Sequence, residues 1–140
     1  MIVLDTNVVS ELMRGSPAGS VRRWARTIPA AERFLTATSV AELTYGAARL
    51  PVVRRRDILE RRINATVNEE FAGQVLPFDV DAARRFGPLV AARDSRGLPI
   101  ETADAQIAAI CLHHGAALAT RNTRDFEGLG LTMINPWGEG

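Results

Sequence analysis

The amino-terminal stretch Met1-Ile2-Val3-Leu4-Asp5-Thr6-Asn7 decides the fold. Four apolar residues run directly into an acid, a hydroxyl and an amide. A short apolar run followed by helix-capping residues is typical of a buried strand of a parallel sheet that leads into a helix. Open α/β sheets bind ligands at the carboxyl ends of their strands, near the point where the strand order reverses. We therefore predict that Asp5 stands at this edge of the sheet.

The rest of the chain alternates between strand and helix patterns. Strands are predicted at 34–38, 74–78, 117–120 and 131–134, and helices at 7–14, 21–28, 39–50, 53–72, 79–96 and 102–114. Gly87-Pro88 is expected to kink or split the helix that contains it, and Gly115 is expected to cap the helix before it. This alternation predicts a three-layer α/β/α sandwich around a mostly parallel sheet of about five strands. With 140 residues, the chain is expected to form a single domain.

The composition excludes several classes of function. The net charge is +1 and all 17 basic residues are arginine, so no mechanism can use a catalytic lysine. The arginines between Arg54 and Arg62 are compatible with a solvated helix face or with an RNA groove. No apolar run approaches the roughly 20 residues of a membrane span, and a strand that begins at residue 2 leaves no room for a signal peptide. One cysteine, Cys111, cannot form an internal disulfide, so we expect a cytoplasmic protein.

Each of the prominent acids has a simple structural explanation. Asp5 is a possible helix cap, and Ser39-Val40-Ala41-Glu42 reads as a capping box. Asp104 lies where a helix dipole favours an acid, and Asn122 or Asp125 is suited to a turn.

The topology brings these residues to one edge of the sheet. Asp5 ends the first strand, and Glu42 lies in the first turn of the helix that follows the second. The helix that carries Asp104 leads into the fourth strand, and the loop after that strand carries Asn122 and Asp125. Clustered carboxylates are costly unless one is protonated or a cation lies between them. Oxygen ligands favour Mg²⁺ or Mn²⁺, so the sequence predicts a divalent metal site.

Other polar residues are left out of this site. Asp79 and Asp81 are expected at the same edge, but beside a peripheral strand. His113 and His114 suit the carboxyl end of a helix, and Cys111 is expected to be a core residue.

Several short motifs, taken in order, resemble the PIN-domain ribonuclease toxins of the VapC type, and the Asn-Pro-Trp ending suggests the FitB-like branch. They are Leu4-Asp5-Thr6-Asn7, Ser39-Val40-Ala41-Glu42-Leu43, Thr102-Ala103-Asp104-Ala105-Gln106-Ile107-Ala108-Ala109, Ala119-Thr120-Arg121-Asn122, Asp125-Phe126 and Ile134-Asn135-Pro136-Trp137. Their order and spacing cover essentially the whole chain.

The resemblance implies a Mg²⁺- or Mn²⁺-dependent endoribonuclease, the toxin of a type II toxin–antitoxin module. It also implies a cognate antitoxin, a homodimer, a toxin–antitoxin hetero-oligomer and contact with DNA only through the antitoxin. Helices 7–14 and 39–50 flank the acids and carry Met13 and Leu50, which suit a groove for an antitoxin segment. We expect an antitoxin arginine to approach the acids and compete with the metal.

The same resemblance assigns roles to individual residues. The metal-binding acids fall on Asp5, Glu42 and Asp104, the fourth site falls on Asn122 or Asp125, and the hydroxyls near the metal are Thr6 and Thr120. Because Asn122 is neutral where some relatives have an acid, the number of metal ions stays open. A cation held by Asp5 and Asp104 would polarise the RNA phosphate, with Glu42 acting through water.

Three alternatives use similar residues. A phosphatase of the haloacid dehalogenase type needs an Asp-x-Asp pair, but Asn7 occupies the second position. Phosphatases of this type and response-regulator receivers typically use a lysine, which this chain lacks. The third alternative is a catalytically inactive PIN-like module that acts only in an antitoxin and DNA complex.

Overall fold

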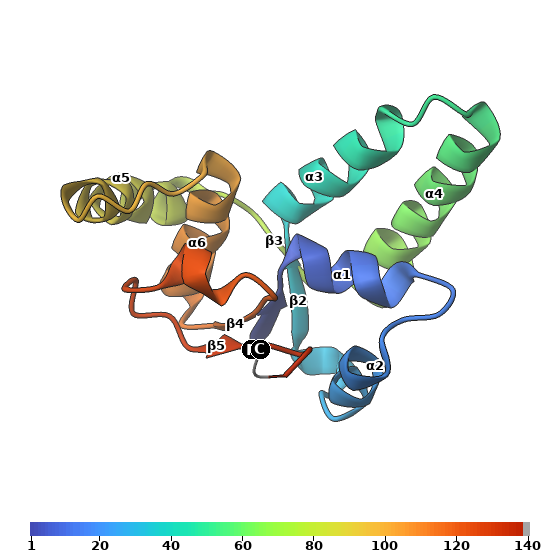
Figure 1. Cartoon of the computed structure of the whole chain (residues 1–140), viewed down its shortest axis with the longest axis horizontal. Coiled ribbons are helices and arrows are strands. Elements are labelled where there is room, and N and C mark those ends of the chain that lie inside the picture. Colours follow the sequence, from blue (N-terminus) through green and yellow to red (C-terminus); the bar gives the residue numbers. More distant parts are fainter. Residues whose placement is uncertain (139–140) are drawn as a thin grey trace.

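Five short parallel strands form the central sheet of the computed structural model, which describes residues 1–138. They are β1 (Ile2–Leu4), β2 (Arg33–Thr36), β3 (Val75–Leu76), β4 (Ala117–Ala119) and β5 (Met133–Ile134). Their order across the sheet is β3-β2-β1-β4-β5 (Figure 1). The order reverses between β1 and β4, so the carboxyl ends of these two strands mark the expected ligand-binding position.

Helices cover both faces of the sheet. They are α1 (Thr6–Met13), α2 (Gly19–Arg26), α3 (Ala37–Ala48), α4 (Val53–Ala65), α5 (Val80–Ser95) and α6 (Thr102–His114). Helices α5 and α6 lie on one side of the sheet, and α1, α3 and α4 lie on the other (Figure 1). None of the helices within residues 1–138 has the length and apolar character needed to cross a bilayer.

Alternating strand residues build a separate core on each face. In β1, Val3 packs with the core under α5 and α6, whereas Leu4 packs with the core under α1, α3 and α4. In β4, Leu118 and Ala119 divide between the two cores in the same way. Successive strand residues point to opposite faces, so both faces of β1 and β4 pack against apolar cores. The predicted three-layer sandwich with a parallel sheet is confirmed.

The start of α3 differs from the prediction. The helix begins at Ala37, two residues early, because the side chain of Thr36 accepts a hydrogen bond from the backbone N–H of Ser39 at 3.0 Å. Thr36 is therefore the cap, and the proposed capping box at Ser39 is wrong. Glu42 consequently lies in the second turn of the helix, not in the first.

Two other helix boundaries also differ from the prediction. A kink or a split was predicted at Gly87-Pro88, and the split does not occur, because α5 continues from Val80 to Ser95 through Pro88. Pro88 is exposed, so water can solvate the carbonyl that loses its N–H partner. The predicted helix 53–72 is α4 followed by a π-helical turn (Thr66–Glu70). The predicted cap at Gly115 is confirmed, since its φ of 62° is the left-handed conformation that glycine adopts readily.

Candidate active site

Asp5 lies at the point where the strand order reverses and is 4% exposed. Its Oδ1 accepts a hydrogen bond from the N–H of Thr6 at 2.8 Å. Its Oδ2 accepts one from the hydroxyl of Thr120 at 2.7 Å and a longer one from the amide of Asn7 at 3.3 Å. Burial raises the pKa of Asp5, while the hydrogen bond from Thr120 acts in the opposite direction. The carboxylate is thus fixed in position by residues that follow β1 and β4.

Glu42 is linked to the same edge through Thr6. The hydroxyl oxygen of Thr6 lies 2.6 Å from Oε1 of Glu42 and 2.8 Å from Oγ of Ser39. A carboxylate only accepts and a hydroxyl has one proton. Thr6 therefore donates to Glu42 and accepts from Ser39. These bonds join α1 to α3 and fix one oxygen of the exposed Glu42 side chain.

Asp104 occupies the first turn of α6 and is half-buried. Its pKa is raised to about 7, chiefly by burial and then by the charges of Asp5, Asp125, Glu42 and Glu101 in that order. Within residues 1–138 the ion pairs are Arg14–Glu11 and His113–Asp81, so none of these five acids has a cationic partner there. The fold therefore gathers the predicted acids into mutual electrostatic range without neutralising them.

Sequence reasoning did not identify Glu101. It directly precedes α6 as its N-cap position, one turn before Asp104. The sequence signal that could have identified it is an acid directly before the helix that carries Asp104. Because its charge raises the pKa of Asp104, Glu101 belongs to the same electrostatic cluster.

The loop after β4 contributes in two ways. The N–H of Asn122 donates to Oγ1 of Thr120 at 3.1 Å, so this hydroxyl is held on one side by Asn122 and on the other by Asp5. Asp125 lies in the short 3₁₀ turn Thr123–Phe126 and is exposed. Of the two candidates for the fourth position, Asp125 is the one whose charge acts on Asp104.

Asp79 and Asp81 do not lie at this edge, contrary to the prediction. Asp81 Oδ2 is 4.0 Å from Nε2 of His113, in the last turn of α6. His113 follows Asp104 by nine positions in α6, which corresponds to roughly 14 Å along the helix axis. Strand β3 has only two residues, and the chain then continues in an extended conformation to Asp79. Helix α5 therefore begins beside the carboxyl-terminal end of α6.

Asp79, Asp81 and His113 together form the tightest group of potential metal ligands among residues 1–138. One ligand atom from each lies within 4.8 Å of the others. Both acids are exposed, and Asp79 uses Oδ1 to cap α5 by accepting from the N–H of Ala82 at 3.0 Å. Among residues 1–138, no three of the acids around Asp5 meet this condition. Asp79 and Asp81 are therefore useful as a control cluster in metal-binding experiments.

Cys111 is fully buried, and burial raises the pKa of its thiol to about 12. A thiol that stays protonated is a poor nucleophile. The prediction that Cys111 is a core residue is confirmed.

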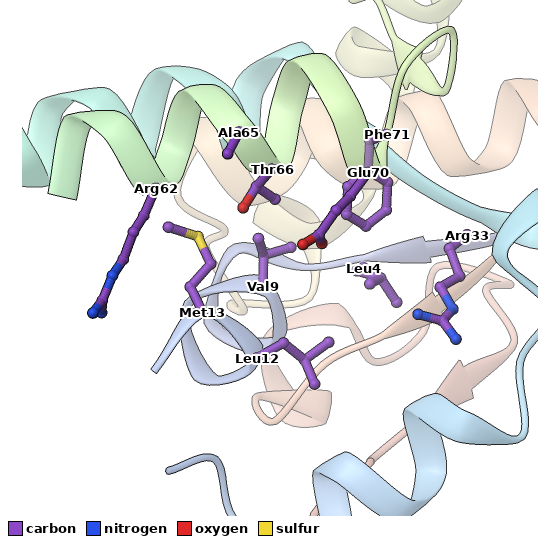
Figure 2. A pocket seen from close by; sticks show the side chains of 10 residues that line it. All are labelled: Leu4, Val9, Leu12, Met13, Arg33, Arg62, Ala65, Thr66, Glu70 and Phe71. Atoms are coloured by element: carbon purple, nitrogen blue, oxygen red, sulfur yellow. The ribbon is translucent and has the colours of Figure 1, made fainter. Parts of the chain in front are cut away.

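A groove of about 390 Å³ begins at Thr6 and Glu42 and continues between α1, α3 and α4. A neighbouring pocket of about 410 Å³ shares Met13 and Arg62 with it and continues toward Arg33 and Glu70 (Figure 2). The expectation that Met13 lies in a groove beside the acids is confirmed. Leu50 lines neither cavity.

Comparisons with known proteins agree with this architecture. Residues 2–130 match the family model described as PIN domain. The chain is 44% identical over 137 residues to "VapC ribonuclease Y4jK" of Sinorhizobium fredii, with 98% of both chains covered. It is 35% identical over 137 residues to "Toxin FitB" of Neisseria gonorrhoeae, covering 98% of this chain and 99% of that protein.

A solved structure gives the same result. The crystal structure of FitAcB from Neisseria gonorrhoeae superposes with a TM-score of 0.91 at 34% identity and covers 99% of this chain and 100% of that one. The chain therefore belongs to the PIN domain family, in the branch that contains the VapC ribonucleases and the toxin FitB.

Proposed function

We propose that this protein is a Mg²⁺- or Mn²⁺-dependent endoribonuclease and the toxin of a type II toxin–antitoxin module, acting in the cytoplasm. The observation that carries the proposal is the carboxylate cluster at the point where the strand order reverses. The pKa of Asp104 is raised to about 7 by burial and by the charges of Asp5, Asp125 and Glu42. Relatives that share most of the chain are named ribonucleases and a toxin. Membership of this family removes the phosphatase and receiver alternatives.

The donor set suits a hard divalent cation. All its charged groups are carboxylates, which Mg²⁺ and Mn²⁺ prefer. Asp5 and Asp104 are the residues that would hold the ion. Glu42, whose side chain is exposed, would contribute through water, as Mg²⁺ usually retains several of its waters. Asp125 is the favoured fourth acid, and Asn122 supports Thr120 through its backbone.

The reaction is hydrolysis of an RNA phosphodiester. A bound cation would supply charge that polarises the phosphate and lowers the pKa of a water molecule. Thr120 and the N–H of Thr6 hold Asp5 in place, and Thr6 holds Oε1 of Glu42. This leaves Oε2 of Glu42 to orient the attacking water and accept its proton. No covalent intermediate is required.

Cleavage of RNA by the purified chain tests this proposal. The protein should cut single-stranded regions of total RNA in 10 mM Mg²⁺ or Mn²⁺ and lose this activity in EDTA. Asp5→Asn should be inactive under both conditions, whereas Asp81→Asn should cut as the wild type does. Cleavage that is equal in wild type and Asp5→Asn and that persists in EDTA would contradict the proposal. Absence of cleavage in every condition would favour the alternative of an inactive binding module.

The partners proposed for the chain are a cognate antitoxin and a second copy of itself. Solved relatives include a complex titled "Structure of FitAB bound to IR36 DNA fragment", at 34% identity and a TM-score of 0.90. We expect the antitoxin to provide the DNA contact in a complex of this kind. An antitoxin arginine could pair with two carboxylates in a bidentate geometry, and the acids around Asp5 have no cation of their own among residues 1–138.

Competition between antitoxin and metal follows from this arrangement. The affinity of the full-length chain for the cognate antitoxin should fall as Mg²⁺ rises at constant ionic strength, because both occupants need the same carboxylates. It should also fall when the antitoxin arginine is changed to alanine, and the Mg²⁺ dependence should then disappear. Calorimetric titrations at several Mg²⁺ concentrations would measure both effects. An affinity that ignores Mg²⁺ and the arginine would mean that the antitoxin blocks access of RNA alone.

A further inference from the structure

The groove that begins at Thr6 and Glu42 is lined by three arginines, which we call the arginine groove. They are Arg14 at the end of α1, Arg49 at the end of α3 and Arg62 on α4. Figure 2 shows Arg62 extending from α4 to a position beside Met13 on α1. Three helices that are separate in sequence thus direct arginines to one groove, and this groove opens at the candidate active site.

Most of the positive charge in the arginine groove is not neutralised by the protein. Arg14 pairs with Glu11 at 3.0 Å. Arg49 lies over the ring of the exposed Tyr45, 5.5 Å from its centroid. Neither Arg49 nor Arg62 forms an ion pair with a carboxylate in the part of the chain that the structure describes. Guanidinium groups in a groove are suited to phosphate oxygens, which they bind in a bidentate manner.

A glycine in the last turn of α3 leaves space at the wall of this groove. Gly46 lines the groove, and a Cβ added there would meet no atom within 4 Å. A side chain introduced at this position would therefore extend into the groove without displacing protein atoms.

We infer that the arginine groove binds the backbone of the single-stranded RNA substrate on one side of the cleaved bond. This inference rests on the proposed function. Phosphates would lie on Arg49 and Arg62, and the apolar groove residues Leu43, Leu59 and Ile63 would contact sugars or bases. The strand would then pass Glu42 and Thr6 to reach Asp5. Contacts of this kind fix the position of the strand and carry no sequence information.

The helix α4 offers a matched control for this inference. Arg61 and Arg62 are neighbours and both are exposed, but Arg61 lines a different surface depression with Arg54 and Asp57. The arginines between 54 and 62 are therefore divided: Arg62 belongs to the groove, and Arg54 and Arg61 lie away from it. Gly87 in α5 provides the second control, because it is also inside a helix with no atom within 4 Å of an added Cβ.

Binding of a fluorescent oligo-uridine to the full chain in EDTA tests the inference without cleavage. Arg62→Gln and Arg49→Gln should each weaken binding about 5-fold and reduce the slope of log affinity against log salt by about 0.7. Gly46→Glu should weaken binding at least as much, because it places a negative charge in the groove. Arg61→Gln and Gly87→Glu should bind as the wild type does. Circular dichroism melts of all variants would show that each is folded.

Each result supports or overturns the inference. Equal effects of Arg61→Gln and Arg62→Gln would mean that charge on α4 acts generally and that the groove is not a specific path. Unchanged binding of oligo-uridine in Arg62→Gln, Arg49→Gln and Gly46→Glu would overturn the inference. The groove would then be a candidate binding site for a protein segment. A wild type that binds oligo-uridine through the groove but never cleaves RNA with metal would contradict the proposed function alone.

Discussion

Replacing Asp104 by asparagine should lower the rate of RNA cleavage by about 10³-fold, since it removes a charge that binds the cation. The same variant should melt at an unchanged or higher temperature at pH 8 without metal. At this pH the carboxylate of Asp104 is ionised although its pKa is raised to about 7 by burial and by its acidic neighbours. Asparagine removes the unfavourable charge and keeps the shape of the side chain.

The effect of Asp104→Asn on stability should depend on pH. Because the pKa of Asp104 is higher in the folded state, its contribution to stability is fully present below the ordinary pKa of 3.8 and is lost as the pH rises through about 7. The melting temperature of Asp104→Asn relative to wild type should therefore increase between pH 4 and pH 8. Calorimetry in EDTA would measure it, with Asp57→Asn on α4 as an exposed control. A variant that unfolds at pH 8 would identify Asp104 as a helix-capping residue only.

Metal affinity should fall about tenfold for each pH unit below about 7, or about 100-fold between pH 7 and pH 5. The reason is that the cation binds ionised Asp104, so it must displace the proton held by this raised pKa. Calorimetric titration of Mn²⁺ in buffers of different ionisation enthalpy would give both the affinity and the number of protons released. The Asp81→Asn background would remove the competing group with Asp79 and His113.

An affinity for Mn²⁺ that stays constant between pH 5 and pH 8, with no proton release, would mean that Asp104 is not a metal ligand. In Asp104→Asn the residual affinity should be weak and should lose most of its pH dependence over this range. Retention of the full pH dependence in that variant would assign the proton to another group.

The sequence was sufficient for features that depend on local pattern. The run Ile2-Val3-Leu4 has apolar residues at every position because α5 and α6 cover one face of β1 and α1, α3 and α4 cover the other. Asp5 could be placed at the ligand-binding edge because parallel strands all end there. The order of the strands and helices alone then predicted that Glu42, Asp104 and Asp125 lie near Asp5.

Features that depend on tertiary detail were not accessible in the same way. Two hydroxyls, of Thr36 and Ser39, could both cap α3, and only the structure distinguishes them. The position of Asp79 and Asp81 depends on the path of the chain between β3 and α5, and the periodicity of apolar residues does not predict this path. The arginine groove combines residues of three helices whose arginines, read individually, resemble a solvated surface.

The location of a bound Mn²⁺ ion tests the central claim most directly. Crystals of the chain soaked in Mn²⁺ would reveal the ion by its anomalous scattering. We expect a peak between the carboxylates of Asp5 and Asp104 at the edge between β1 and β4, which disappears in crystals of Asp5→Asn. A peak found only beside Asp79, Asp81 and His113, with none near Asp5, would contradict the proposed active site.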